Sequence, residues 1–298
     1  MTNKFNNIIS PTNTRRNFIK LTSCISIAIA LIVPVMTSAA SLDEIKSRGV
    51  LKAVTEDAFP PFEFITNGKP DGFHADVIKE LRAYAPFKVT QEQLPWTGLL
   101  AAVSAGKYDA AITGAGVTEE RLSKFDYAPP ICPNVTYYIK RKGDNRISGI
   151  KNLSGLKVGV QAGSAVLATI PQLEAKLKAM GGNLGEVVEY QSYPEVYADL
   201  ANGRLDYAVN SVVSASTMVA KRSDIFELGE ATAGLGFIAW PVKKGNGELL
   251  DYLAGFITHM RDTGKLAELQ TKWFGSSFPD LPKESIISVA QFRNLTSQ

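Results

Sequence analysis

The sequence predicts an α/β fold of mainly parallel sheets with both faces covered by helices, and three features of the chain predict this class. Segments of strand composition alternate with helical segments at the spacing of β-α-β units. A second unit of the same kind begins after residues 137–139. Loops with glycine, aromatic or charged residues follow several of the strands. Because ligands bind beyond the carboxyl ends of the strands in such sheets, we expect the functional site there.

The leader, residues 1–40, has the pattern of a cleaved export signal. Arg15 and Arg16 precede an apolar run over 21–36, and small residues lead to Ala40, after which we expect cleavage. Consecutive arginines before such a run resemble the twin-arginine export signal, which makes the twin-arginine export machinery the expected partner of this segment. Export through the Sec route is the alternative.

Charge and composition exclude several classes of partner. The formal net charge is +3, but the leader carries four positive charges and no acid, so the remainder has a net charge of −1 and no signal for nucleic acid or an anionic membrane. Cys24 lies in the leader, where the apolar run follows it instead of preceding it, which disfavours lipidation. Cys132 is then alone and cannot form an intramolecular disulfide. His74 and His259 show no metal-ligand spacing, so we expect no metal and no cofactor.

The first part of the mature chain reads as repeated strand–helix steps. Gly49 ends a short helix, and Pro60 and Pro61 cannot continue a central strand. A loop that carries Glu56 and Phe59 therefore follows the first strand. The expected elements are a helix over 41–49, strands over 50–55, 87–92 and 109–113, and helices over 72–81 and 96–106.

The second part repeats this arrangement. A turn of small residues over 162–165 leads into a helix, whose first backbone amides are a ready site for an anion. We expect the residues from Asp280 onward to be a tail. The other expected elements are strands over 157–161, 187–191, 207–211 and 236–243, and helices over 195–201, 248–260 and 266–274.

The stretch over 109–121 carries the clearest signal for function. It reads as a buried strand, a turn of small residues and a helix that Thr118 caps. A cation in the first turn, Arg121, is misplaced unless an anion lies nearby. A guanidinium beside backbone donors that glycine leaves accessible can hold a carboxylate through two parallel hydrogen bonds. The alternative is that Arg121 pairs only with Glu119 or Glu120 on a solvated helix face.

Taken together, the chain resembles the periplasmic solute-binding proteins of polar amino-acid ABC transporters, family 3. The resemblance covers essentially residues 42–278 and rests on motifs that are weak singly and strong in this order. These are GVLKAVT at 49–55, Phe62, GF at 72–73 with Asp76, GKYDAAI at 106–112, TEER at 118–121, LKVGV at 156–160, GRLDYA at 203–208 and TKWFG at 271–275.

The resemblance implies a two-lobed periplasmic binding protein fold in which two crossing hinge strands join the lobes. Residues 41–134 and 234–298 would form lobe 1, and residues 135–233 would form lobe 2. The crossings are expected near 132–137 and 232–237. Such a protein is a periplasmic monomer that works with the permease of an ABC transporter.

The resemblance also implies how the ligand is held. Arg121 matches the arginine that grips the ligand α-carboxylate, and Phe59 and Trp96 match an aromatic pair that sandwiches the ligand side chain. Glu56 matches a position that often contacts the distal end of the ligand. Ordinary core packing is the alternative for the two aromatic residues, and a solvated surface role is the alternative for Glu56.

Four small residues complete the contacts that the resemblance implies. Thr113 and the Gly114 carbonyl match groups that meet the ligand oxygens or the α-amino group. Ser164 and Ala165 match the anion contact of lobe 2, through a side chain or a backbone N–H.

The sequence departs from the family pattern at three positions. Gly116 stands where a hydroxyl residue is usual, and His74 replaces an acid; we expect His74 to be structural or exposed. Ser211 stands where an aspartate usually pairs with the α-ammonium. A serine cannot neutralise a buried ammonium. Either Glu56 takes that role, or the ligand is a modified amino acid or a simple carboxylate.

Three classes of function remain. The first is a non-catalytic receptor of an ABC importer that closes on its ligand. The second is a periplasmic cyclohexadienyl dehydratase-like enzyme, in which Glu56 would act as the acid. The third is the sensor domain of a signalling receptor, which needs an anchor or kinase module that nothing after Gln298 supplies. We expect the receptor, because no nucleophile–base pair is evident.

Overall fold

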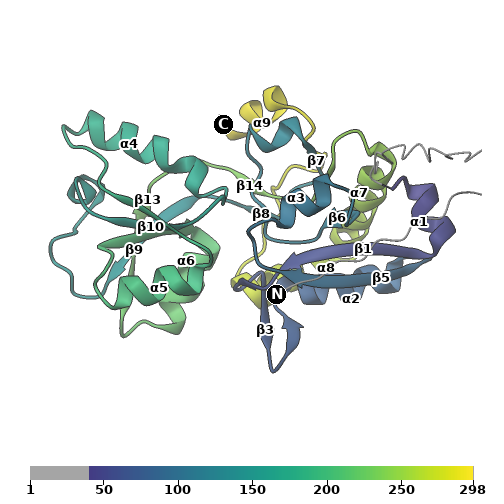
Figure 1. Cartoon of the computed structure of the whole chain (residues 1–298), viewed down its shortest axis with the longest axis horizontal. Coiled ribbons are helices and arrows are strands. Elements are labelled where there is room, and N and C mark those ends of the chain that lie inside the picture. Colours follow the sequence, from purple (N-terminus) through teal and green to yellow (C-terminus); the bar gives the residue numbers. More distant parts are fainter. Residues whose placement is uncertain (1–39, 298) are drawn as a thin grey trace, which may run out of the picture. The chain divides into compact units, whose positions relative to one another are not determined.

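The computed structural model describes residues 40–297, so the predicted export signal lies outside the described residues except for Ala40. Within this part, strands form two five-stranded sheets (Figure 1). The first sheet has the order β5 (Lys88–Leu94), β1 (Val50–Glu56), β6 (Ala110–Ala111), β15 (Pro241–Lys243) and β7 (Phe125–Tyr127). The second has the order β11 (Val187–Tyr190), β10 (Val158–Gln161), β12 (Tyr207–Ser211), β9 (Thr136–Arg141) and β13 (Phe226–Ala231).

Two smaller sheets and a set of helices complete the described chain. The small sheets are β2 (Ala58–Phe59) with β3 (Glu63–Thr66) and β4 (Lys69–Asp71), and β8 (Cys132–Pro133) with β14 (Phe237–Ile238). The α-helices are α1 (Leu42–Arg48), α2 (Phe73–Tyr84), α3 (Leu99–Ser104), α4 (Ile170–Ala179), α5 (Tyr193–Ala201), α6 (Val212–Lys221), α7 (Gly247–Asp262), α8 (Lys265–Phe274) and α9 (Val289–Thr296). Three short 3-10 helices are η1 (Arg121–Ser123), η2 (Ile150–Leu153) and η3 (Leu167–Thr169).

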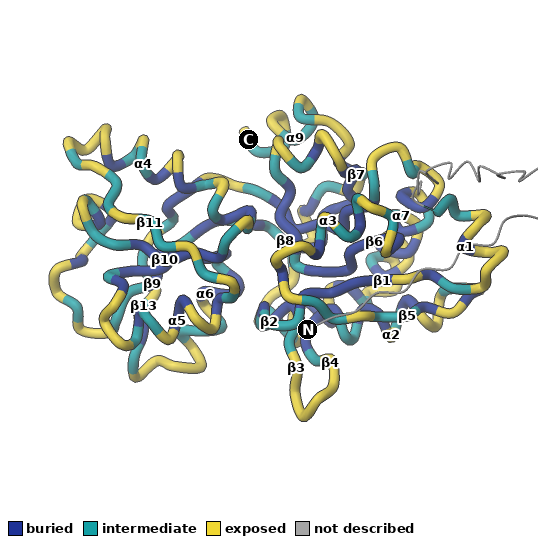
Figure 2. Tube along the Cα trace, viewed as in Figure 1, coloured by how far each residue is buried: buried dark blue, intermediate teal, exposed yellow. Residues whose placement is uncertain are grey.

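Local signals explain how the chain begins. Ser41 caps α1 in a capping box with Glu44, and Gly49 ends the helix with a φ of 70°. The following strand, β1, is almost entirely buried, and Figure 2 shows the same for the centre of both sheets. Helices α2 and α3 pack on the first sheet, and α5 and α6 pack on the second.

Each large sheet combines parallel and antiparallel pairs. β1 is parallel to β5 and β6, and β10 is parallel to β11 and β12, as the strand–helix alternation predicted. β15 and β9 run antiparallel to their neighbours. β9 follows β8 directly and β15 follows β14 directly, without the crossover helix that a parallel connection needs. One strand of each sheet, β15 or β9, is therefore reversed, and parallel pairs join only three of the other four strands.

The pair β8 and β14 connects the two large sheets. It is antiparallel, with Cys132 opposite Ile238. The first sheet takes its strands from before β8 and after β14, and the second takes its strands from between them. We call the first sheet with its helices lobe 1 and the second sheet with its helices lobe 2.

Two sequence predictions need correction. Thr118 does cap a turn, since its Oγ1 accepts a hydrogen bond from the Arg121 N–H at 3.2 Å, but only η1 forms before β7 begins. The residues after Asp280 are no free tail. Ile286 is fully buried and exchanges two backbone hydrogen bonds with Tyr127, and α9 packs against the core beyond it. Elements α6, β9 and β13 also lie outside the predicted set.

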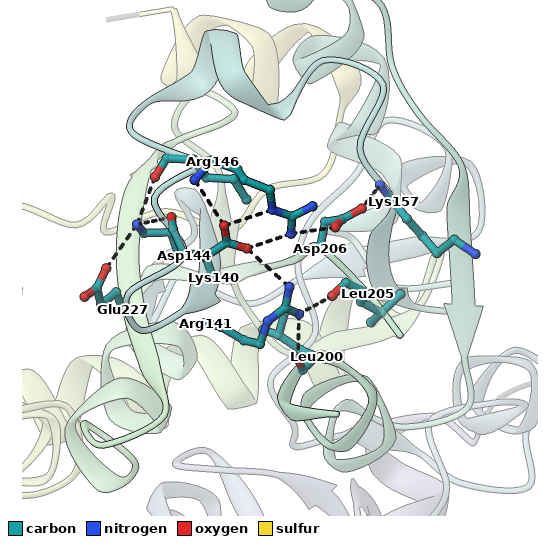
Figure 3. A network of polar contacts seen from close by, with 10 residues as sticks. Lys140, Arg141, Asp144, Arg146, Lys157, Leu200, Leu205, Asp206 and Glu227 are labelled. Carbon is teal, nitrogen blue, oxygen red and sulfur yellow. Dashed lines mark hydrogen bonds and ion pairs between the residues drawn. The ribbon is translucent and has the colours of Figure 1, made fainter. Parts of the chain in front are cut away.

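A polar network holds the end of lobe 2 that lies farthest from β8 (Figure 3). Arg146 binds Asp144 at 2.7 Å and Asp206 at 2.9 Å, and Asp206 accepts the N–H of Lys157. The hydrogen bonds from Arg146 lower the pKa of Asp144 to about 2. This network fixes the N-terminal ends of β10 and β12.

Candidate functional site

The carboxyl ends of the central strands of both lobes meet at one small pocket. The pocket has a volume of about 20 Å³, which is room for about one water molecule. Its lining residues are Glu56, Phe59, Trp96, Gly114, Gly116, Asn134, Gln161, Ser164, Ala165, Val166, Tyr193 and Ile238. Seven of the ten residues nominated from the sequence are in this set, and the lobes are closed over it.

Hydrogen bonds and one ring contact join the lobes around the pocket. The hydrogen bonds run from Gln161 Nε2 to Glu56 Oε1 (2.6 Å), from Arg121 Nη2 to Gly163 O (2.8 Å) and from Thr97 Oγ1 to Gln191 Oε1 (2.7 Å). The rings of Phe59 and Tyr193 stack at 5.6 Å. Each contact joins residues that lie at or beyond the carboxyl ends of strands, which is where an α/β fold places a ligand.

Arg121 does not line the pocket itself, but it contacts two residues that do, Gly116 and Trp96, and it reaches lobe 2. Its Nη1 donates to the Gly116 carbonyl at 2.6 Å, and its Nη2 donates to Gly163 across the lobes. The guanidinium lies over the ring of Trp96, 5.0 Å from the centroid, in a cation–π contact. Burial lowers its pKa, yet an arginine stays charged. A fixed cation therefore stands at one end of the pocket with carbonyl oxygens as partners that an anion can replace.

The surface alternative for Arg121 does not describe this structure. Glu119 is held by Arg293, at 2.7 Å and 2.6 Å to its two oxygens. Within the described residues, no ion pair joins Arg121 to Glu119 or Glu120. Glu119 is bound to the C-terminal helix instead, because Arg293 of α9 provides its partner.

Both predicted aromatic residues line the pocket, but each already has a neighbour. Phe59 stacks on Phe62 as well as on Tyr193, and the ring of Trp96 lies against the guanidinium of Arg121. Tyr193 was missed from the sequence. It begins α5 just beyond the carboxyl end of β11, and the rule that selected Phe59 and Trp96 applies to it equally.

Glu56 stands at the end of β1, buried at 2% exposure. Burial raises its pKa well above the usual value, and the nearby charge of Glu63 raises it further. Gln161 and Arg121 act in the opposite direction, but less strongly. Burial and the charge of Glu63 therefore favour the protonated acid, and Glu56 is no solvated surface residue.

Thr113 lies behind the pocket and does not line it. Its hydroxyl donates to Glu63 at 2.5 Å and accepts the N–H of Glu56 at 3.1 Å. The N–H of Gly114 also donates to Glu63, at 3.0 Å. His74, expected to be structural or exposed, is fully buried and contacts the same carboxylate at 2.5 Å. Sequence reasoning missed Glu63, because its partners are up to 51 residues away.

Ala165, one of the small residues of lobe 2, packs closely against Gly116. A Cβ at Gly116 would lie 2.4 Å from the Ala165 Cβ, so in this closed arrangement only glycine fits. The Ser164 hydroxyl accepts the N–H of Leu167 at 3.0 Å. Within residues 40–297, the N–H groups of Ala165 and Val166 donate no hydrogen bond, and both residues line the pocket.

Ser211 does not reach the pocket. It is buried, and its hydroxyl caps α6 by accepting the N–H of Ser214 at 3.4 Å. The side chain of Asn210 is likewise engaged, because its Nδ2 donates to the Tyr197 hydroxyl at 2.8 Å. Of the described residues that line the pocket, Glu56 alone carries a carboxylate.

The described residues contain no group of three or more His, Cys, Asp or Glu side chains that could hold a metal ion. In the same part of the chain, no helix is both long and apolar enough to cross a membrane.

Known proteins of similar sequence are amino-acid-binding proteins. The family model for bacterial extracellular solute-binding proteins, family 3, matches residues 51–276. The L-cystine-binding protein TcyJ of Escherichia coli strain K12 is 27% identical over 237 residues, which cover 79% of this chain and 86% of that protein. The arginine-binding periplasmic protein of Mannheimia haemolytica is 27% identical over 230 residues, 74% of this chain and 90% of that protein.

Solved structures show the same two-lobed α/β fold. An ancestral arginine-binding protein bound to arginine superposes with a TM-score of 0.68 at 30% identity, covering 76% of this chain and 99% of that one. The ancestral amino acid-binding protein AncCDT-1, a precursor of cyclohexadienyl dehydratase, gives a TM-score of 0.69 at 25% identity, covering 78% and 98%.

Proposed function

We propose that this chain, which belongs to the bacterial extracellular solute-binding proteins of family 3, acts in the periplasm and binds an amino acid or amino-acid-like carboxylate between its lobes for an ABC importer. The observation that carries the proposal is the guanidinium of Arg121, charged and held at the pocket between two carbonyl groups and Trp96. The relatives compared above bind cystine and arginine, which share an α-carboxylate.

The pocket has opposite electrostatic ends. Arg121 and the unpaired amides of Ala165 and Val166 suit a carboxylate at one end. Glu56 suits a cationic or N–H-donating group at the other. Because Ser211 is committed to capping α6, we assign the role of the missing acid to Glu56. Phe59, Trp96 and Tyr193 supply apolar walls between the two ends.

Binding must be coupled to opening. A pocket of about 20 Å³ admits no amino acid, so the lobes have to separate and close again around the ligand. The ligand stabilises the closed form through its higher affinity for that form. The permease of the transporter then distinguishes the closed protein from the open one, as expected for hinge closure.

A thermal-shift screen tests the proposal. The mature protein is heated with arginine, cystine, histidine and other amino acids, opines, betaines, ectoine-like solutes and aromatic acids, and a ligand raises the melting temperature by mass action. Arg121→Ala should abolish the shift, because the carboxylate loses its charged partner. Arg222→Ala, at an exposed position, is the control and should keep it. If a ligand raises the melting temperature of Arg121→Ala as much as that of the wild type, Arg121 does not hold the ligand carboxylate.

A dehydratase is the second candidate, because Glu56 is a buried acid in the pocket and its pKa is raised. A protonated carboxyl can give its proton to a departing hydroxyl group as water leaves. Incubation with prephenate or arogenate and assay of the aromatic product tests this function. Turnover that Glu56→Gln abolishes supports the enzyme, and the absence of turnover by protein that binds amino acids supports the receptor.

A further inference from the structure

We propose that Glu63 is a positioning residue of the pocket: an ionised carboxylate, oriented by His74, that fixes the ends of β1 and β6 and makes the Glu56 end selective for a positively charged ligand group. The selectivity rests on the proposed function. The positioning stands on the buried hydrogen bonds alone.

The direction of these hydrogen bonds follows from Trp240. Its indole N–H donates to Nε2 of His74 at 3.0 Å, and an indole can only donate. Nε2 must therefore accept, so the ring proton of a neutral His74 lies on Nδ1. Nδ1 then donates to Glu63 Oε2 at 2.5 Å. All three side chains are buried, at 1% exposure or less, so water cannot supply a substitute partner.

Glu63 receives hydrogen bonds on its other side as well. The Thr113 hydroxyl and the Gly114 N–H both donate to Oε1, at 2.5 Å and 3.0 Å. Thr113 in turn accepts the N–H of Glu56. One carboxylate thus fixes the ends of two neighbouring strands, and every group around it is a donor. A protonated Glu63 could donate only to the Thr113 hydroxyl, whose own hydrogen would then lose its acceptor, so the network favours the ionised form.

The charge of Glu63 reaches the pocket through Glu56. No lysine or arginine in residues 40–297 forms an ion pair with Glu63. The charged groups that act on Glu56 are Glu63 from β3, Asp57 beside it on the chain, and Arg121, while Gln161 from lobe 2 donates to it. The charges of Glu63 and Asp57 favour a proton on Glu56, because an ionised Glu56 would be repelled by both. A cationic ligand group can replace that proton, whereas a neutral group of the same shape cannot.

A ligand-free titration tests the positioning and the charge. The pH midpoint of the Glu56 side-chain carboxyl is followed by NMR of the full mature protein labelled with ¹³C at glutamate, and Glu56→Gln identifies its signal. Glu63→Gln should lower the midpoint, because it removes the nearest negative charge. Glu248→Gln, on the exposed first turn of α7, should leave it unchanged. An unchanged midpoint in Glu63→Gln would overturn the proposal.

Two further variants separate the hydrogen-bond direction from the charge. In Glu63→Gln the donors Thr113 and Gly114 hold the amide oxygen, so the new NH2 group faces the Nδ1–H of His74 and two donors meet. If the ring proton moves to Nε2, two donors meet there instead, because Nε2–H then faces the indole N–H of Trp240. Adding Trp240→Phe removes the conflict, so the His74 ring should carry its proton on Nε2 by ¹⁵N NMR. His74→Gln can accept from Trp240 and donate to Glu63, so it should keep the Glu56 midpoint, whereas His74→Leu should not. Equal behaviour of the two His74 variants would contradict the assigned role.

Arginine and citrulline test the selectivity, because they differ in a guanidinium and a neutral ureido group of similar shape. Calorimetry should show that the wild type prefers arginine and that Glu63→Gln reduces this preference by about tenfold, a change of about 1.4 kcal/mol. An unchanged preference would refute the selectivity. If neither compound binds, the proposed ligand class fails, while the titration still decides the role of Glu63.

Discussion

At the scale of single residues, Glu56 should make the stability of the closed protein depend on pH. Its pKa is raised on folding, so the folded state holds a proton that the unfolded chain releases above about pH 4.5. Stability should therefore fall as pH rises from there towards the folded pKa. Glu56→Gln keeps an acceptor for Gln161 and removes the titration. We predict that its free energy of unfolding is higher than that of the wild type at neutral pH.

Urea denaturation of both proteins at a series of pH values between 4 and 8 measures this effect. If the free energies of unfolding of the two proteins change in parallel with pH across the range, Glu56 is hydrated in the folded protein and contributes no such linkage. Glu248→Gln serves as the control for removal of an acid on the surface.

The residue scale also shows where sequence reasoning ends. Arg121, Phe59 and Trp96 could be predicted, because their place after a strand is a local property. It could not be predicted that the hydroxyl groups of Thr113 and Ser211 are already hydrogen-bonded to other protein groups. Thr113 is bound by a glutamate 50 positions away in the chain, and Ser211 caps a helix that the apolar pattern did not suggest.

At the scale of elements, the segment that contains Ile286 and α9 should contribute to stability. Ile286 is fully buried, whereas its neighbour Ile287 is 50% exposed, so the two form a matched pair. Ile286→Ala should lower the free energy of unfolding by about 2–5 kcal/mol, the usual cost of emptying a buried aliphatic site. Ile287→Ala should change it by less than about 0.5 kcal/mol. Urea denaturation that gives equal values would mean that the segment is not docked.

The sequence did contain signals for α9. Ser288 is a good N-cap, and Val289, Phe292 and Leu295 recur at helical spacing. The prediction failed because the family resemblance ended near residue 278. The helix expected after Thr118 failed for a different reason. Its cap is present, but the chain enters β7 at Phe125, so the edge of the sheet overrides the helical signal.

At the scale of the whole binding unit, the two-lobed α/β fold could be predicted from the order of strands, helices and family motifs. The antiparallel strands β9 and β15 could not, because the two connections through β8 and β14 set their direction and leave no periodic signal in the sequence. How far the lobes close was also beyond the sequence. Closure depends on contacts between residues such as Gly116 and Ala165, which lie in different lobes.

We predict that the close approach of Gly116 to Ala165 is needed for closure, so Gly116→Ala should hold the lobes apart. The added Cβ would lie 2.4 Å from the Ala165 Cβ and 2.9 Å from Asn134 Nδ2, although the Gly116 backbone is outside the left-handed region and tolerates a side chain. Overpacking of this kind costs about 1–3 kcal/mol, and the contact with Ala165 acts against the closed form alone. Ligand affinity should fall by about 5- to 150-fold, and small-angle scattering should give a larger radius of gyration.

A compensating substitution decides whether contact between the lobes causes the loss of closure and affinity in Gly116→Ala. Adding Ala165→Gly to Gly116→Ala moves the methyl group from one lobe to the other, so the clash with lobe 2 disappears and only the contact with the Asn134 side chain remains. Both closure and affinity should then return. Gly247→Ala, where an added Cβ meets no atom within 4 Å, should resemble the wild type throughout. If the double variant stays as open and as weak as the single one, the methyl group acts within lobe 1, and the close approach of Gly116 to Ala165 does not govern closure.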